Sequence, residues 1–320
     1  MRCLWISLLF VLGVVCGGCA SDDDAGTDTP ILRFVFVTHG QASDPFWSVV
    51  QRGALDAAQH TGTRVLYQAP ESFDLVTMSQ LIDAALASQP DGLVVSIPDA
   101  DALEAALMSA REAGVPIVSI NSGGEHSQRL GSLLHVGQSE YEAGYQGGLR
   151  LSAMGATNAL CINQEVGNLA LDERCRGFTD ALESQGSSVE MLAVELGDPT
   201  ESTQRILAAL RSDPSIDALM TLGPTGALPC LRALEEIDNP GINFATFDTS
   251  PEILNAIESG AILFAIDQQQ YMQGYLPVVL LALYHRNENL LAHESLQTGP
   301  GFIIRSNVGR LKELTARGTR

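Results

Sequence analysis

From residue 31 onward, short apolar runs alternate with longer stretches in which apolar residues recur every three or four positions. A short apolar run bounded by turn residues predicts a strand, whereas the longer spacing predicts an amphipathic helix. The expected strands are residues 31–38, 64–68, 92–97, 116–120, 158–163, 190–195, 216–221, 243–247 and 262–266. The expected helices are residues 46–60, 78–87, 102–113, 140–153, 172–185, 202–211, 227–237 and 271–284.

This alternation predicts an α/β protein. Strands and helices that follow one another about every 30 residues form right-handed βαβ units, with helices on both faces of a parallel sheet. The run at residues 92–97 is almost wholly apolar, which is typical of a strand buried on both faces. A chain of 320 residues has room for two domains of about 150 residues each.

A faint internal repeat indicates two similar halves. Residues 88–98 and 115–121 parallel residues 213–224 and 242–248, with a helix between the two parts of each pair. In both halves the second strand ends on a polar residue, Asn121 or Asp248. Ligands of open α/β sheets bind outside the carboxyl ends of the strands, so two facing sheets would bring these residues towards one cleft. The alternative is that each is only a loop cap.

The first residues have the pattern of an export signal. Residues 1–18 contain Arg2, then the apolar run 4–15, then small residues, which predicts a secretory signal peptide. Gly18-Cys19 resembles the bacterial lipoprotein box, in which the cysteine becomes the lipidated first residue, although Cys16 stands where leucine is usual. Simple secretion is the alternative. Residues 19–30 are polar and acidic and are expected to form a disordered tether.

The net charge of the chain argues against a nucleic-acid partner. The chain has 38 acidic and 18 basic residues, a formal charge of -20, which would repel nucleic-acid phosphates. No nucleic-acid partner is therefore expected.

After the signal peptide and Cys19, three cysteines remain, Cys161, Cys175 and Cys230, and an odd number cannot all pair within one chain. At least one is expected to be a small buried apolar residue, and the sequence does not choose the pair for a bridge.

Catalytic motifs are largely missing. The sequence has no G-x-S-x-G, no P-loop, no G-x-G-x-x-G after a strand and no H-E-x-x-H. Asp99 and Asp101 resemble the start of a calcium loop, but Glu104 occupies the position that such a loop gives to glycine. Asp99 and Asp101 are instead expected to cap a helix. We therefore expect no metal, no cofactor and no reaction, while an enzyme with a spatially assembled site stays the alternative.

The segment 38–47 is the most informative part of the chain. Asp44-Pro-Phe-Trp47 follows the first strand and places two aromatic residues beside polar ones. This combination is typical of carbohydrate sites, where a sugar ring packs on an aromatic face and polar groups bind its hydroxyls. The alternative is a hydrophobic contact at a helix start.

Several segments, in this order, resemble the type I periplasmic binding proteins of sugar ABC transporters, the ribose-binding-protein group. The resemblance covers nearly all of the chain after residue 30. Its segments are Asp44-Pro-Phe-Trp47, Gln89-Pro-Asp-Gly-Leu-Val-Val-Ser-Ile-Pro98, Glu112-Ala-Gly-Val-Pro-Ile-Val-Ser-Ile-Asn121, His135-Val-Gly-Gln138, Glu142-Ala-Gly144, Arg174-Cys-Arg-Gly-Phe178, Phe247-Asp248 and Ile266-Asp-Gln-Gln269.

The resemblance implies two Rossmann-like parallel-sheet domains joined by a three-stranded hinge, with crossings near Gln138, Gln269 and Thr298. The N-terminal lobe would comprise residues 31–137 and 269–297. The C-terminal lobe would comprise residues 138–268 and 298–320.

The resemblance also implies a set of ligand contacts. By position these are Asp44, Phe46, Trp47, Asn121, Asp172, Arg174, Asp248 and Gln268. Ile97, Ser122 and Gly223 stand where ribose binders have polar or charged residues, so ribose itself is not the expected ligand. The rule that ligands bind at strand ends adds His39, Glu165 and Asn168 as candidates.

The implied function is capture without reaction. The chain would be a lipoprotein of the periplasm or cell envelope, anchored to the membrane through Cys19. It would bind a sugar or polyol by hinge closure and deliver it to an ABC transporter permease. The alternative is a periplasmic sensor that presents a sugar, autoinducer or nucleoside to a signalling receptor.

Overall fold

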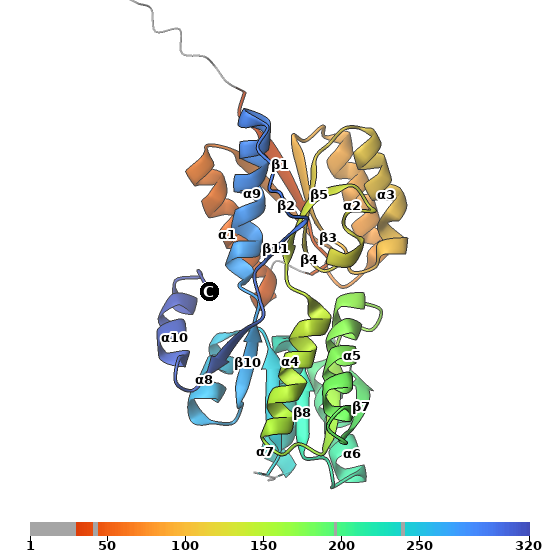
Figure 1. Ribbon diagram of the computed structural model, residues 1–320, viewed down its shortest axis with the longest axis vertical. Helices are drawn as coiled ribbons and strands as arrows, with labels where there is room; N and C mark the ends of the chain where they lie inside the picture. The colour runs from red at the N-terminus through yellow and green to blue at the C-terminus, as the bar shows by residue number, and fades with distance from the viewer. Residues whose placement is uncertain (1–29, 41–43, 195–196, 238–240) are drawn as a thin grey trace, which may run out of the picture. The chain divides into compact units, whose positions relative to one another are not determined.

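The computed structural model describes residues 30–40, 44–194, 197–237 and 241–320 (Figure 1). The predicted signal peptide, Cys19 and the tether up to residue 29 lie outside the described residues. Residues 31–320 form one compact unit. Within the described ranges, no helix has the length and apolar character that crossing a membrane requires.

Two six-stranded sheets organise this unit. The first has the order β11-β5-β4-β3-β1-β2, and all its neighbours are parallel. Its strands are β1 (Arg33–Val37), β2 (Arg64–Gln68), β3 (Gly92–Ser96), β4 (Ile117–Asn121), β5 (Ser132–Gly137) and β11 (Ser295–Gln297). The first sheet therefore combines strands from the beginning and near the end of the chain.

The second sheet has the order β12-β10-β9-β8-β6-β7 and is parallel except for β12, which runs antiparallel to β10. Its strands are β6 (Asn158–Asn163), β7 (Ser188–Ala193), β8 (Ala218–Thr221), β9 (Asn243–Phe247), β10 (Phe264–Asp267) and β12 (Gly301–Ile304). The predicted α/β class with two parallel-sheet domains is confirmed. The chain passes between the sheets after β5, after β10 and after β11.

Helices cover both faces of each sheet, and an apolar core lies under each layer. Helices α1 and α9 share a core with the first sheet, and α2 and α3 cover its other face. On the second sheet α4 and α5 lie on one face and α6, α7 and α8 on the other. The helices are α1 (Pro45–Thr61), α2 (Leu75–Ala87), α3 (Ala100–Glu112), α4 (Glu140–Ala153), α5 (Leu169–Glu183), α6 (Pro199–Ser212), α7 (Pro224–Ile237), α8 (Pro251–Ser259), α9 (Gln270–Asn287) and α10 (Val308–Ala316).

All the expected strands and helices are present, but several begin elsewhere. The strand expected at 190–195 is β7, shifted two residues towards the N-terminus. Helix α2 begins three residues before the prediction because Asp74 caps it, accepting hydrogen bonds from the backbone nitrogens of Val76 and Thr77. The expected cap at Asp99 is confirmed by the same kind of bonds, whereas Asp101 lies within the first turn of α3 and is not its cap. Strands β5, β11 and β12 and helices α8 and α10 were not predicted.

The two halves pack their helices in the same way, so the internal repeat extends to three dimensions. Helices α1 and α9 lie side by side, as do α4 and α5 (Figure 1). A Cβ on Gly274 of α9 would lie 1.9 Å from the backbone oxygen of Val50, and one on Gly144 of α4 would lie 2.0 Å from that of Arg174. Glycine therefore lets both helix pairs approach closely, and the contact at Gly144 fixes α4 against the turn of α5 that carries Arg174.

Candidate ligand-binding site

A cavity of about 370 Å³, partly open to solvent, lies at the carboxyl ends of strands from both sheets. Seven of the eight predicted ligand contacts line this cavity, and Asp172 does not. The lining residues are His39, Asp44, Phe46, Trp47, Asn121, Gln164, Glu165, Leu171, Arg174, Leu222, Gly223, Pro224, Thr225, Asp248 and Gln268.

The two polar residues of the internal repeat, Asn121 and Asp248, share an unusual backbone conformation. Asn121 ends β4 and Asp248 follows β9, and both have φ of 62°. Asparagine and aspartate enter this left-handed region more readily than most residues, at a cost that is commonly tolerated at functional sites. The Asn121 amide donates to Oε1 of Gln268 at 3.1 Å. The Gln268 amide donates to both carboxylate oxygens of Asp248, at 3.0 and 3.2 Å.

Arg174 forms the back wall of the cavity and is almost fully buried. Its Nε and one terminal nitrogen donate to the two carboxylate oxygens of Glu140, at 2.7 and 3.0 Å. Its other terminal nitrogen donates to the backbone oxygen of Leu222 at 2.8 Å and lies 3.8 Å from Oδ2 of Asp248. The guanidinium carbon is 4.4 Å from the centroid of the Phe247 ring. Glu140 already compensates the positive charge, so a ligand need not be an anion.

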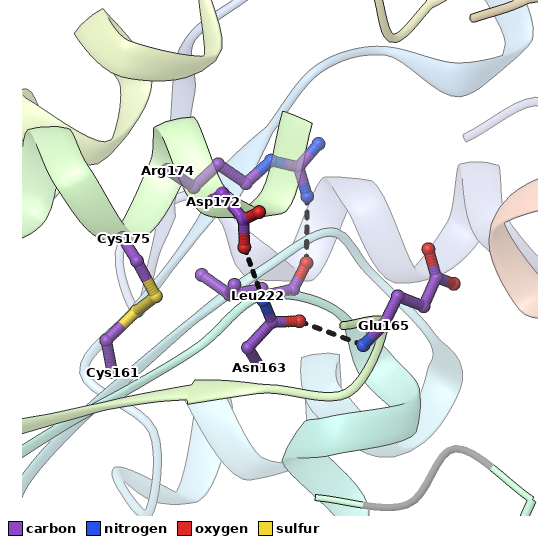
Figure 2. Close-up of a disulfide and its surroundings, with 7 residues drawn as sticks. All are labelled: Cys161, Asn163, Glu165, Asp172, Arg174, Cys175 and Leu222. Atoms are coloured by element: carbon purple, nitrogen blue, oxygen red, sulfur yellow. Dashed lines mark hydrogen bonds between the residues drawn. A yellow bond between two sulfur atoms is a disulfide. The ribbon is translucent and has the colours of Figure 1, made fainter. Parts of the chain in front are cut away.

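Figure 2 shows how a disulfide fixes the helix that carries Arg174. Cys161 of β6 is bonded to Cys175 of α5, which settles the pairing that the sequence left open. Cys230 is free and buried, as expected for at least one cysteine. The disulfide therefore ties the residue next to Arg174 to the central part of the second sheet.

Asp172 lies on the same turn but binds within the protein (Figure 2). Its Oδ1 accepts a hydrogen bond from the Asn163 amide at 3.0 Å, and Oδ1 of Asn163 accepts one from the backbone nitrogen of Glu165 at 2.9 Å. Asp172 thus supports the loop that carries Glu165. The expected contact between Asp172 and a ligand stays a prediction.

Phe46 and Trp47 lie in the first turn of α1, where Asp44 caps the helix by accepting a hydrogen bond from the Phe46 backbone nitrogen at 2.8 Å. Their rings meet edge to face with centroids 4.9 Å apart. Both rings line the cavity and also belong to the core under the first sheet. The same two residues therefore line the cavity, as the predicted carbohydrate site requires, and also make the hydrophobic contact at the helix start that was the alternative.

His39 extends this wall, as the strand-end rule predicted. Its Nδ1 lies 2.8 Å from the Ser96 hydroxyl, and its Nε2 lies 3.3 Å from the Asn168 amide nitrogen. That amide also donates to Glu165 at 2.7 Å. His39 and Glu165 line the cavity. Asn168 does not line it, but its amide nitrogen contacts both side chains.

Burial controls protonation throughout the cavity. It raises the pKa of Asp248 to about 7, against the opposing effect of the Arg174 charge. Burial likewise raises the pKa of Asp44 and of Glu165. The His39 pKa falls to about 3 because the ring is buried and, to a smaller extent, because Arg174 is near, so the imidazole is neutral at pH 7.

Gln164 is a lining residue that the sequence analysis missed. Its Oε1 is buried and has no hydrogen-bond partner among the described residues. A buried acceptor without a partner costs about 1–3 kcal/mol. Gln164 directly follows β6, and the strand-end rule that selected Glu165 could have found it. In the described ranges, no group of three or more acidic, histidine or cysteine side chains is arranged to hold a metal ion.

The buried pair of Arg174 and Glu140 should dominate local stability. Arg174→Met leaves the Glu140 carboxylate buried without its partner, and we expect a loss of about 3–5 kcal/mol in the free energy of unfolding. Adding Glu140→Gln should recover most of this loss. Arg176→Met is the matched control: Arg176 lies on the same helix but forms an exposed pair with Glu173, and its loss should cost less than about 1 kcal/mol. Urea denaturation measures all four proteins, and equal effects of the two arginine variants would contradict this account.

Comparison with known proteins gives consistent results. Residues 34–289 match the model of a periplasmic binding protein domain. The chain is 27% identical over 295 residues to the xylose/arabinose-binding protein XylF of Sulfolobus acidocaldarius, which covers 87% of this chain and 72% of that protein.

Two solved structures are similar to this chain in both sequence and fold. A carbohydrate transporter from Acidothermus cellulolyticus, crystallised with myo-inositol, is 34% identical with a TM-score of 0.85 and covers 91% of this chain and all of its own. A periplasmic sugar-binding protein of an ABC transporter from Legionella pneumophila is 25% identical with a TM-score of 0.77, covering 83% of this chain and 99% of its own. The match to the domain model and the two-sheet architecture together show that this chain belongs to the periplasmic binding protein family, type I.

Proposed function

We propose that this protein captures a neutral monosaccharide or cyclic polyol in the cavity between its two sheets and delivers it to an ABC permease. One observation carries the proposal: the cavity combines the aromatic residues Phe46 and Trp47 with hydrogen-bonding side chains from both sheets, among them Asn121 and Asp248. Relatives that bind myo-inositol, xylose or arabinose support the same ligand class. Their descriptions name transport or binding of carbohydrates, and none of these observations favours a sensory role.

The cavity suits a ligand that has many hydroxyls and no net charge. Asp44, Glu165 and Asp248 supply carboxylate oxygens as acceptors, and the Gln164 carbonyl is an acceptor without a partner in the described structure. Hydroxyls that donate to these carboxylates would satisfy them, and a sugar ring would pack against Trp47, which lines the cavity although its side chain is only 4% exposed. Because each buried polar group left unpaired costs about 1–3 kcal/mol, the arrangement of these acceptors would set the specificity.

Closure would follow from contacts to both lobes. We assign residues 31–137 and 269–297 to one lobe and residues 138–268 and 298–320 to the other. The lobes would rotate about the segments near Gln138, Gln269 and Thr298, where the chain passes between the sheets. A ligand that contacts Asn121 in one lobe and Asp248 in the other has its full set of contacts only in the closed form, so binding favours closure.

The calorimetric test compares myo-inositol, xylose and arabinose as ligands. Asp248→Asn keeps the shape and the left-handed backbone but removes the charge, so the cognate ligand should bind about tenfold to a hundredfold more weakly, as expected for a hydrogen bond to a charged group. Asp83→Asn makes the same chemical change at an exposed position of α2, outside the cavity lining, and should leave the affinity unchanged. Absence of binding for all three ligands, or equal effects of the two variants, would contradict the proposal. Recovery of unaltered ligand after incubation separates binding from turnover.

Binding should also depend on pH through Asp248. Its pKa is about 7, and ligand hydroxyls donate to the ionised carboxylate, so below about pH 7 a proton must leave before the ligand binds. We expect the dissociation constant to rise by up to about tenfold for each pH unit below about 7. Titrations from about pH 5 to about pH 8 measure this. Asp248→Asn should flatten the profile, and a wild-type affinity that improves with acid would overturn this role for Asp248.

We also place the protein at the outer face of a membrane, anchored through a lipid on Cys19 after removal of residues 1–18. The support is the pattern of the first residues, together with the membership of a periplasmic family. Mass spectrometry of the N-terminal peptide of the mature protein tests the anchor. A diacylglyceryl group on Cys19 is the expected result, and an unmodified N-terminus would show simple secretion instead.

A further inference from the structure

The parts of the chain built on the two sheets also touch at the start of α5, away from the crossing segments. Leu169, the first residue of α5, donates its backbone N–H to the backbone oxygen of Pro98 at 2.9 Å. Pro98 belongs to the loop between β3 and α3, beside the first sheet. Next to this bond, the Asn168 amide nitrogen lies 3.3 Å from Nε2 of His39, which lies after β1. The start of α5 therefore contacts two loops that belong to the other sheet.

The Leu169 N–H depends on this contact for a partner. The first N–H groups of an α-helix have no acceptor within the helix, and a capping residue satisfies only some of them. Here Asn168 is the cap: its Oδ1 accepts from the Ala170 nitrogen at 3.1 Å, and its backbone oxygen accepts from the Leu171 nitrogen at 3.0 Å. The Leu169 N–H lies outside these two bonds and donates to Pro98 instead. If the two sheets moved apart, this N–H would exchange Pro98 for water.

The contact between Asn168 and His39 has a defined donor and acceptor. The Asn168 oxygen is occupied by the helix cap, so the amide nitrogen faces His39, and Nε2 of the neutral ring accepts. The same amide nitrogen donates to Glu165 at 2.7 Å. On the other side, the Ser96 hydroxyl accepts from the His39 backbone nitrogen at 3.0 Å. Asn168 and His39 are 0% and 4% exposed, so the contact is buried while the two loops meet.

Each of the two contacting loops is held within its own part of the fold. Before α5, the Asn168 nitrogen donates to the backbone oxygen of Glu165 at 3.1 Å and closes the turn. Directly before Pro98, the Ile97 nitrogen donates to the backbone oxygen of Ser122 at 3.2 Å. Neither loop therefore needs the other for its shape. The contacts between them can form and break together when the two sheets move as units.

We propose that the start of α5 is a latch that holds the two lobes closed, formed by the bond from Leu169 to Pro98 and the contact of Asn168 with His39. The latch rests on the proposed rotation of the lobes, but not on the identity of the ligand. Leu169, Pro98 and Asn168 do not line the cavity, so the bond between Leu169 and Pro98 stabilises the closed form without contacting a ligand. The ligand-free protein should therefore be closed for a measurable part of the time.

The latch should raise the affinity for every ligand by the same factor. The apparent dissociation constant equals the intrinsic constant divided by the fraction of protein in the binding-competent form. Because the latch forms after the ligand has entered, its loss should speed release and leave entry unchanged. Loss of one hydrogen bond should lower the ratio of closed to open protein by up to about fivefold.

Leu169→Pro removes the N–H of the latch. Proline is favoured at the first position of a helix, where the missing N–H has no acceptor within the helix, and the Leu169 side chain is 41% exposed. Leu169→Ala is the matched control, because it shortens the same side chain and keeps the N–H. Calorimetry and stopped-flow kinetics use myo-inositol, xylose and arabinose. Leu169→Pro should bind each of these ligands that the protein accepts up to about fivefold more weakly than Leu169→Ala, with release faster by the same factor.

A measurement without ligand tests the latch independently. Ala105→Cys on α3 and Ala208→Cys on α6 provide exposed positions for spin labels, one in each lobe. The native cysteines of the described ranges are bonded or buried and do not compete for the label. Pulsed electron resonance then gives the distances between the labels, and the closed fraction should be smaller in Leu169→Pro than in Leu169→Ala. Asn168→Ser keeps a capping oxygen but is too short to reach His39, and it should lower the closed fraction as well.

The outcomes separate the latch from the proposed function. Equal closed fractions in Leu169→Pro and Leu169→Ala, or equal affinities for a ligand that binds to both, would overturn the latch and leave the proposed function intact. A closed fraction that Asn168→Ser leaves unchanged would remove the contact with His39 from the latch. If the closed fractions differ as expected while none of the three ligands binds, the latch stands and the proposed ligand class fails.

Discussion

The buried pair of Arg174 and Glu140 is the interaction on which the site depends. Glu140 begins α4, directly after the chain leaves the first sheet, and Arg174 lies in the second turn of α5. Their bidentate contact therefore fixes the first crossing to the second sheet. Arg174 also holds the loop after β8 through Leu222 and faces Asp248. One charged pair thus ties the back of the cavity, where Arg174 lies, to the first crossing between the sheets.

This arrangement combines stability with a cost at the site. The disulfide between Cys161 and Cys175 and the close contact at Gly144 both hold α5 near Arg174. At the same site, Asn121 and Asp248 have left-handed backbone conformations, which are unfavourable for most residues, and burial raises the pKa of Asp248 to about 7. Because burial raises the pKa of Asp248, this carboxyl group makes folding less favourable at neutral pH than in acid, which is consistent with a residue kept for binding at a cost in stability.

Much of the fold follows from local patterns in the sequence. Apolar strands alternating with amphipathic helices determined the α/β class, and the repeat ending in Asn121 and Asp248 indicated where the sheets would converge. The missed strands have physical reasons. Strand β5 carries Ser132 and His135, which interrupt its apolar run, and β11 and β12 have only three and four residues. Such short edge strands are stabilised by their neighbours and leave little signal of their own.

The site could be predicted only where a strand end or a family motif marked it. Asp44, Trp47 and Gln268, which line the cavity, were predicted in this way. Glu140 was missed because its role depends on Arg174, which is 34 residues away in the sequence and adjacent only after folding. Asp172 is the opposite case, a residue that was predicted as a ligand contact but does not line the cavity. It lies in the segment that the family resemblance indicated, and its carboxylate accepts a hydrogen bond from Asn163 within the protein. Sequence position placed the segment, and side-chain packing decided which residues line the cavity.

The most direct test of the central claim is a crystal structure of the protein with the sugar or polyol that it binds. The account predicts a ligand between the sheets, with hydroxyl oxygens within about 3 Å of the Asp248 carboxylate and the Asn121 side chain. The ring should lie against Trp47, and the pair of Arg174 and Glu140 should stay intact. A ligand bound elsewhere, or one that separates Arg174 from Glu140, would contradict it.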